Sequence, residues 1–553
     1  MFLKISQIIK TFSKKERYFF FIALAVFAVS GTLWATNCYY KNTVLTPVRG
    51  GTYTEGLIGQ PIAINPLIAT DNEADRDLVN LVFASVLDLA EDYKVDETKK
   101  IWNIRLKPDL KWSDDEPLTS DDVVFTIATI QDPDTRSPLF ATWQGVSVER
   151  LSEKEVRIIL KNPYGFFSDN LKNLKIAPHH VFDNLPPQNL RLSDYNLKPV
   201  SNGPYKFINY EKRADGFIEK YYFTINPNYV LEKPLIKNFN VWFFASKAEA
   251  IDAFNQKAIS GIGGLEFKDL PALKVNHNIS EADIPRYYAI FFNPGISAPL
   301  KEKEVRIALS ETIDREKIIN AVFGGKAVAA FGPIPSTVAG YGAALYSSLA
   351  SSSRETAINR LEKAGWKLNE AGVRTKMVQK NTVSLEFDII VPSAQFLTDT
   401  VNLIKDEWQA IGVKLNPVVL KPSEVISQSI KTRNYQMVIF GNILNNNPDI
   451  FSFWHSSQRF HPGLNLSIFN DKTMDALLES VRQNFDDQSR NQDLGKIQKI
   501  IHDHKPAVFL FSPKYFYAAS KNLGGFSATF ITTPSNRFDN VNQWHVKTAR
   551  VFK

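Results

Sequence analysis

Two groups of histidines contain the residues best able to bind a metal in this sequence. One group is His179 with His180, and the other is His502 and His504 on either side of Asp503. Neither has the i, i+4 spacing that places two imidazoles on one face of a helix. We therefore interpret both groups as structural, and we expect neither a metal site nor a cofactor.

A pair of adjacent carboxylates, Asp121 and Asp122, offers the residue type used in general acid–base catalysis. The pair follows Thr119, which can cap a helix, and acidic side chains in a first helical turn interact favourably with the helix dipole. Helix capping therefore explains the pair. The sequence also lacks a Gly-x-Ser-x-Gly, P-loop, zinc or Gly-x-Gly-x-x-Gly motif. We expect no enzymatic activity.

Aromatic and amide side chains can bind a ligand without reacting with it. Trp143, Trp242, Trp454 and Phe511 are candidates for the walls of a cleft, with core packing as the alternative for each. The segment 441–447 contains four asparagines. They suit a neutral ligand that forms hydrogen bonds, or simply a loop rich in turns.

Composition and charge exclude several classes of protein. Over 553 residues, 44% are hydrophobic and 22% are charged, which is typical of a globular protein with three or four domains. Residues 1–17 hold five basic side chains and one acidic side chain out of a net charge of +7. The rest of the chain has no large basic field, so we expect no nucleic-acid binding. Cys38 is the only cysteine, so no internal disulfide can form.

The segment 18–40 contains no charged residue. About 20 apolar residues in a helix span a bilayer core of about 30 Å. The basic segment 1–17 should remain in the cytoplasm, which makes 18–40 a single-pass signal anchor in the cell membrane and places the body outside, in the periplasm or at the cell surface. The alternatives are a signal peptide cleaved after Ser30 and lipid attachment at Cys38. We interpret 41–49 as a linker.

Beyond the linker, strand-like and helix-like segments alternate. The residue pattern predicts strands at 156–160, 385–391 and 435–440. It predicts helices near 305–312 and 401–408, where apolar residues recur at helical spacing. Strands that alternate with helices over hundreds of residues indicate layered α/β domains.

The segment 112–125, which contains Ser-Asp-Asp-Glu-Pro-Leu, resembles a motif of the family 5 extracellular solute-binding proteins, the receptors of peptide and nickel ABC importers. Five further segments resemble the family's landmarks in the family's order: 201–205, 292–315, 363–366, 408–413 and 447–454. The resemblance extends over about residues 50–530 of the chain.

This resemblance implies a two-lobed, periplasmic-binding-protein-like α/β clamshell of class II, with an extra domain and a ligand enclosed between the lobes. By analogy, lobe I comprises 50–88, 199–288 and 522–553, the extra domain is 89–198, and lobe II is 289–521.

The chain departs from the family where the ligand's amino terminus is held. Peptide-binding members have an aspartate three residues before an Asp-Pro pair. Here the pair falls at 447–448, and Leu444 stands at the aspartate position. A buried ammonium without its counter-ion costs about 3–5 kcal/mol. Either a free amine is not recognised, or another acid holds it; the candidates are Asp449, Asp71 and Glu73.

We expect the ligand-binding residues to come from the edge of lobe I, the asparagine-rich segment and the walls of the cleft. They are Asp71, Asn72, Glu73, Asn442, Ile443, Leu444, Asn445, Asp449, Trp454 and Phe511. The backbone of 442–444 should offer N–H and C=O groups to an extended ligand by strand addition.

The sequence therefore predicts a monomeric, membrane-anchored receptor outside the cytoplasm. It would capture an oligopeptide or a similar small solute and deliver it to the permease subunits of an ABC transporter. The alternatives are a binder of an oligosaccharide or metal chelate, and a surface adaptor of the family's shape whose cleft is altered or lost. A cell-surface enzyme would need a nucleophile with its base, or a carboxylate pair, in the cleft.

Overall fold

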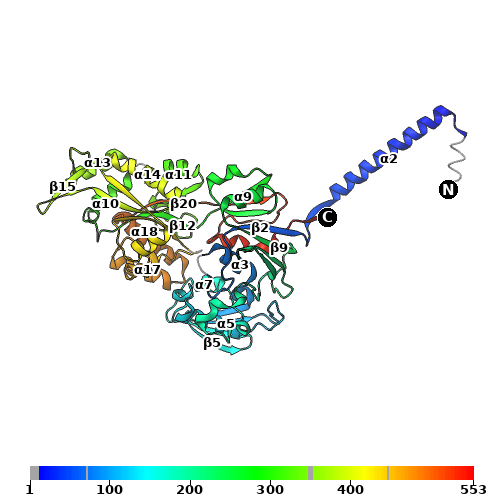
Figure 1. Cartoon of the computed structure of the whole chain (residues 1–553), viewed down its shortest axis with the longest axis horizontal. Helices are drawn as coiled ribbons and strands as arrows, with labels where there is room; N and C mark the ends of the chain where they lie inside the picture. The colour runs from blue at the N-terminus through cyan, green and yellow to red at the C-terminus, as the bar shows by residue number, and fades with distance from the viewer. Residues whose placement is uncertain (1–10, 70–71, 347–352, 445–446) are drawn as a thin grey trace.

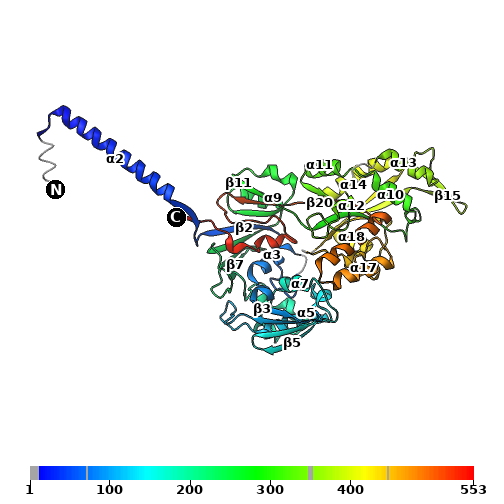
Figure 2. The same ribbon diagram turned by 180° about the vertical axis from the view of Figure 1, so that it is seen from behind.

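The computed structural model describes residues 11–69, 72–346, 353–444 and 447–553. Two α/β lobes lie side by side, an extra domain packs beneath them, and one long helix projects away from lobe I (Figures 1 and 2). The predicted serine-rich surface loop, at 347–353, falls almost wholly outside the described residues.

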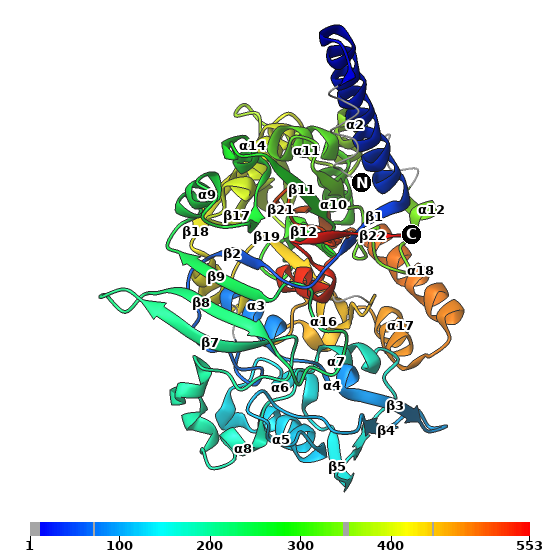
Figure 3. The ribbon, with the colours of Figure 1, turned by 90° about the vertical axis from the view of Figure 1, so that its right-hand side faces the viewer.

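The projecting helix, α2 (Lys14–Asn42), contains no buried residue. Ser13 caps it, since its side chain accepts a hydrogen bond from the backbone N–H of Glu16. By length and composition α2 is the one helix in the described chain able to cross a membrane. The predicted linker 41–49 is largely structured instead: β1 (Thr43–Pro47) pairs antiparallel with the C-terminal strand β22 (Thr548–Phe552), as Figure 3 shows.

Lobe I is built on a mixed seven-stranded sheet in the order β11-β21-β10-β2-β9-β8-β7. Its strands are β2 (Thr52–Ile58), β7 (Tyr205–Lys212), β8 (Ile218–Ile225), β9 (Asn238–Phe244), β10 (Gly261–Leu265), β11 (His277–Ala282) and β21 (Tyr515–Ser520). The helix α3 (Glu73–Val82) packs against the main core of this lobe. The helix α9 (Lys247–Asn255) covers a second core formed with β10 and β21.

The extra domain has a four-stranded antiparallel sheet in the order β3-β4-β6-β5. Its strands are β3 (Ala90–Val95), β4 (Ile101–Leu106), β5 (Ser147–Ser152) and β6 (Glu155–Ile159), and its helices include α4 (Val86–Leu89), α5 (Ser120–Gln131), α6 (Phe140–Trp143), α7 (Phe167–Asn173) and α8 (His179–Phe182). Thr119 and Asp122 form a capping box at the start of α5, which confirms the interpretation of Asp121 and Asp122 as capping residues.

Lobe II has a six-stranded sheet in the order β13-β20-β12-β19-β17-β18. Its strands are β12 (Arg286–Phe292), β13 (Ala327–Ala329), β17 (Glu386–Pro392), β18 (Lys414–Leu420), β19 (Met437–Ile443) and β20 (Ala507–Pro513). Helices cover both faces because alternate residues of the central strands point to opposite sides. On β19, Met437 and Ile439 join one core while Val438 joins the other.

One face of the lobe II sheet packs against α10 (Lys303–Glu311), α11 (Arg315–Phe323), α13 (Arg354–Lys363) and α14 (Gln395–Gln409). The other face packs against α16 (Phe451–Trp454), α17 (Lys472–Gln483) and α18 (Asp487–His504). A small sheet of β14 (Lys367–Leu368), β15 (Arg374–Val378) and β16 (Asn381–Ser384) extends from this lobe.

The chain crosses between the two large sheets twice, at 283–285 and at Lys514, and we call these crossings the hinge. The sheets divide the chain at places that differ from the predicted boundaries. β21 pairs with β10 and β11, so 515–520 belongs to the lobe I sheet although we predicted lobe II up to 521. β12 already begins at Arg286, before the predicted boundary at 289.

Candidate functional site

Two cavities lie where the domains meet. The hinge cavity, of about 270 Å³, is lined by both lobes, with Glu73 and Phe267 from lobe I and Arg286, Tyr288 and Phe396 from lobe II. The outer cavity, of about 810 Å³, lies between the extra domain and lobe II. The ends of β12 and β19 connect the two, because Arg286 lines the first cavity and its cross-strand partner Ile443 lines the second.

The end of β19 has a free backbone edge. The N–H of Leu444 donates to the carbonyl of Pro285 at 2.7 Å, which fixes the hydrogen-bonding register with β12. In an antiparallel pair, the N–H and C=O groups of successive residues point alternately towards the partner strand and away from it. Because those of Leu444 point towards β12, those of Gly441 and Ile443 point away from it. On that side β17 pairs with β19 only at Met437 and Val438. Within the described chain, the edge at 441–443 therefore has no strand partner and can accept an extended ligand.

The structure corrects the expectation that all of 442–444 faces the ligand. Asn442 is 3% exposed, and its side-chain Nδ2 donates to the Tyr287 hydroxyl at 2.9 Å. Leu444 is also buried and forms part of the floor of the outer cavity. Only Ile443 presents its side chain outward, because successive residues of a strand point to opposite faces.

The lobe I edge of the site is the start of α3. Asn72 is its N-cap: the side-chain oxygen accepts from the N–H of Ala74, and Nδ2 donates to the carbonyl of Gln60 at 2.8 Å. Glu73 is exposed and lines the hinge cavity. The other two residues predicted nearby, Asp71 and Asn445, lie outside the described residues.

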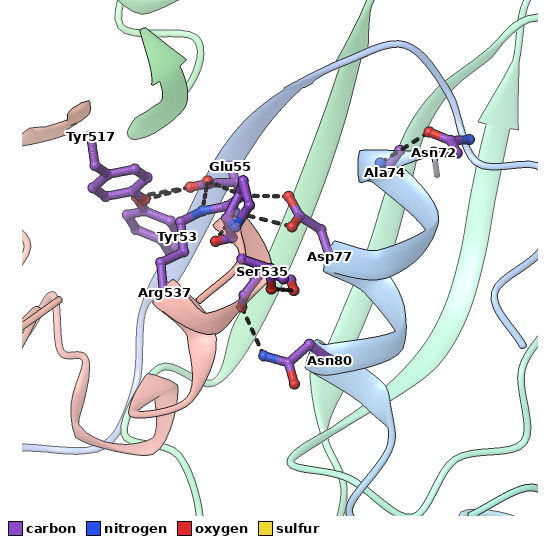
Figure 4. Close-up of polar contacts among 11 residues, drawn as sticks. Tyr53, Glu55, Asn72, Ala74, Asp77, Asn80, Tyr517, Ser535 and Arg537 are labelled. Atoms are coloured by element: carbon purple, nitrogen blue, oxygen red, sulfur yellow. Dashed lines mark hydrogen bonds and ion pairs between the residues drawn. The ribbon is translucent and has the colours of Figure 1, made fainter. Parts of the chain in front are cut away.

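A buried ionic cluster fixes α3 in place (Figure 4). Arg537, 1% exposed, lies 2.6 Å from Asp77 of α3 and 3.0 Å from Glu55 of β2. The hydroxyl of Tyr517 donates to Glu55 at 2.6 Å. Burial raises the pKa of Glu55, although the arginine opposes this shift. The C-terminal segment thus holds the helix whose first turn forms the edge of the site.

Asp449 does not offer a free carboxylate. It forms an ion pair with Arg482 of α17 at 2.9 Å, and it accepts a hydrogen bond from the hydroxyl of Tyr164 at 2.8 Å. Burial and the neighbouring aspartate raise the pKa of Tyr164, so its hydroxyl stays protonated as the donor. These contacts correct the expectation that Asp449 holds a ligand amine, because its charge is already neutralised while it joins lobe II to the extra domain.

Two predicted cleft aromatics are core residues. Trp454 is fully buried and its Nε1 donates to the Tyr287 hydroxyl, while Phe511 is fully buried against Phe323 at a centroid distance of 4.7 Å. The aromatic rings that line the hinge cavity are others, which sequence reasoning missed: Phe267, Tyr288, Phe323, Phe396, Tyr515 and Phe516. The sequence does not distinguish Tyr288 from its neighbour Tyr287; in the structure Tyr287 is buried and Tyr288 lines the cavity.

The two histidine groups have structural partners. His179 lies 3.0 Å from Asp183, and His180 lies 3.0 Å from Asp114. His502 contacts Asp503, its neighbour in sequence. In the described part of the chain, no three histidine, cysteine or acidic side chains are placed together to hold a metal ion.

The model of one protein family, described as "Bacterial extracellular solute-binding proteins, family 5 Middle", matches residues 85–461. The chain belongs to this family. The match confirms the resemblance in the motifs and makes the molecule a solute-binding protein of the ABC-transporter type.

Known family 5 proteins resemble the chain over almost its whole length. The oligopeptide-binding protein AppA of Bacillus subtilis is 24% identical over 546 residues, covering 95% of this chain and 97% of AppA. The structure of that AppA with a nonapeptide has a TM-score of 0.71 at 23% identity, covering 91% of this chain and 100% of AppA.

The structure of NikZ from Campylobacter jejuni in complex with Ni(L-His) has a TM-score of 0.72 at 24% identity, covering 89% of this chain and 99% of NikZ. These likenesses confirm the predicted two-lobed fold.

Proposed function

We propose that the chain is the membrane-anchored receptor of an ABC importer and that it captures oligopeptides between its lobes. The observation that carries the proposal is the free edge of β19 at Gly441 and Ile443, beside a cavity of about 810 Å³. A peptide backbone can pair with such an edge regardless of its side chains. The cavity lies within the range of ligand pockets, about 300–1,000 Å³. The curated relative AppA, named as oligopeptide-binding, supports this choice of ligand.

Capture would work by closure about the hinge. Glu73 and Phe267 come from lobe I, while the β19 edge and Tyr288 come from lobe II. A ligand that touches both lobes binds the closed form more tightly than the open form, and this difference shifts the equilibrium towards closure. The closed form would then dock on the permease subunits.

The contacts at the base of α2 support retention of the helix as an anchor. The ring of Phe552 lies 5.9 Å from that of Tyr39, and the Arg550 guanidinium lies over Tyr40 at 4.2 Å. The N–H of Lys553 donates to the carbonyl of Asn42 at 2.9 Å. Cleavage after residue 30 would leave these contacts with only a short helical stub. N-terminal sequencing of protein from native membranes should find no new terminus near residue 30, and such a terminus would contradict the anchor.

Native mass spectrometry of the full-length protein, purified in detergent without refolding, tests peptide capture. We expect co-purified masses that differ by amino-acid residue masses. A single non-peptide mass would instead indicate a sugar or a metal chelate. A bare protein that gains no thermal stability from a pool of peptides would favour the adaptor.

A further inference from the structure

Among the described residues that line the hinge cavity, Arg286 is the cation without an acidic partner. The other cations there are paired: Lys268 with Glu266 at 2.9 Å, Lys326 with Glu281 at 2.7 Å, and Lys514 with Asp283 at 3.6 Å. Among all described residues, no carboxylate lies within ion-pair distance of Arg286, and its buried Nε has no hydrogen-bond partner.

An unpartnered, buried guanidinium nitrogen lowers the stability of the protein without a ligand. A buried donor without a partner loses its hydration and gains nothing in return, and the loss is greater for a charged group. Among the described residues, the aromatic ring that the guanidinium approaches is that of Tyr288, at 5.8 Å from the centroid. A planar guanidinium next to an aromatic ring in a cavity is suited to a carboxylate, which it can hold with two parallel hydrogen bonds.

The position of Arg286 relates it to the proposed peptide path. It faces Ile443 directly across the β12–β19 pair, at the end of the free edge. Side chains of directly opposed residues lie on the same face of an antiparallel pair. Arg286 thus extends from the strand next to β19, on the face that carries Ile443, at the end of the free edge where a short peptide paired with 441–443 would end.

We infer that Arg286 binds a carboxylate of the ligand, the C-terminal carboxylate when the ligand is a peptide. This inference rests on the proposed function and specifies which end of the peptide the protein recognises. The opposite chemistry has little support at the sites that the family resemblance indicated. Leu444 cannot pair with an ammonium, and Asp449 is already paired with Arg482. Among the described candidates, Glu73 is the one acid left that could meet an amine, and as an exposed group it would contribute little.

Calorimetric titration of the full-length protein in detergent tests the inference. The probes are alanine-rich peptides of four to nine residues, each prepared with free ends, with a C-terminal amide, and with an N-terminal acetyl group. We expect the amide to weaken binding about 10- to 150-fold, the equivalent of one charge-assisted contact. We expect acetylation to change the affinity less than about threefold. An amide that binds as well as the free acid would overturn the inference.

Two variants separate the role of Arg286 from a general effect of charge. Arg286→Met should bind the free acid and the amide equally. Lys326→Met is the matched control, because Lys326 lines the same cavity but already has Glu281 as its partner. This control should still discriminate between the two peptides. Thermal unfolding without peptide shows whether each variant is folded, and Arg286→Lys, which keeps the charge, should retain part of the discrimination.

The inference and the proposed function can fail separately. If no peptide binds the wild-type protein but glutarate binds and requires Arg286, the carboxylate site stands and the peptide ligand is wrong. If peptides bind and Arg286→Met still distinguishes the acid from the amide, the peptide ligand stands and the carboxylate site is wrong. If neither peptides nor glutarate bind, both are wrong.

Discussion

Replacing Arg537 by methionine tests how the lobe I edge of the cleft is held. The guanidinium donates to Glu55 from Nε at 3.1 Å and from Nη2 at 3.0 Å. It donates to Asp77 from Nη1 at 3.1 Å and from Nη2 at 2.6 Å. All three side chains are at most 4% exposed. Methionine fills much of the same space but leaves two buried carboxylates without a cation.

Breaking a buried ion pair by removing one partner costs about 3–5 kcal/mol. If lobe I unfolds as a unit of about 150–250 residues, each kcal/mol lowers Tm by about 2–4 °C, so the expected loss is about 6–20 °C. The loss should depend on pH. Burial raises the pKa of Glu55, and the variant lacks the arginine that opposes this shift, so the folded-state pKa of Glu55 lies above the unfolded value of about 4. The protonated form of Glu55 therefore stabilises the fold below about pH 4, and this contribution disappears as the pH rises through the folded-state pKa.

Differential scanning calorimetry of the full-length protein between pH 4 and pH 8 measures both effects. The deficit of Arg537→Met relative to wild type should be largest at pH 8 and should shrink on acidification. Adding Glu55→Gln and Asp77→Asn to the variant should restore most of the stability, because no buried charge remains. A loss below about 2 °C at pH 7, or a deficit that grows on acidification, would refute the reasoning.

Burial raises the pKa of Asp75 to about 6. Since the folded pKa exceeds the unfolded pKa, protonated Asp75 stabilises the fold below about pH 4, and this contribution is lost as the pH rises through 6. Asp75→Asn should therefore remove the dependence of stability on pH in this range. Thermal unfolding at pH 7 should show a free energy of unfolding about 2 kcal/mol higher than that of the wild type. Asp449→Asn should loosen the contact between lobe II and the extra domain, and small-angle scattering should show a larger radius of gyration; an unchanged radius would show that the pair does not hold the domains together. A Cβ on Gly203 would lie 2.5 Å from the backbone of Val82, so Gly203→Ala should lower Tm, whereas Gly495→Ala, where a Cβ meets nothing within 4 Å, should not.

Regular local patterns allowed much of the fold to be predicted. The strand-type residues at 156–160 and the alternation at 385–391 predicted β6 and β17, and helix-like segments predicted α10 and α14. Each of these depends on neighbours within one strand or a few helical turns, so the sequence alone is sufficient. The family was predicted in the same way, from short motifs in the right order, and the family model confirms it.

The lobe boundary could not be predicted, because it depends on which strands pair. Residues 507–520 form a nearly continuous apolar segment, and nothing in its composition shows that the chain changes sheets at Lys514. The cluster around Arg537 was missed for the same reason. Its acidic partners, Glu55 and Asp77, lie 482 and 460 residues away in the sequence.

The candidate site was predicted only in part, because a side chain's type does not reveal which way it points. The pairing register of β19 with β12 buries the side chains of Asn442 and Leu444, whereas Ile443 between them faces outward. For Trp454 and Phe511, core packing was the commoner expectation beside a cleft wall, and both are buried. Arg286 could not be recognised as a candidate from the sequence, because its lack of a hydrogen-bond partner is visible only once the two lobes are assembled.

The central claim is that a peptide pairs with the free edge of β19, and backbone N-methylation of the ligand tests it most directly. The affinities of one bound peptide and its singly N-methylated analogues would be measured by calorimetric titration with the full-length protein. Strand addition predicts that methylation weakens binding at alternate residues, because only every second N–H faces the edge. Equal tolerance of methylation at every position would contradict the claim.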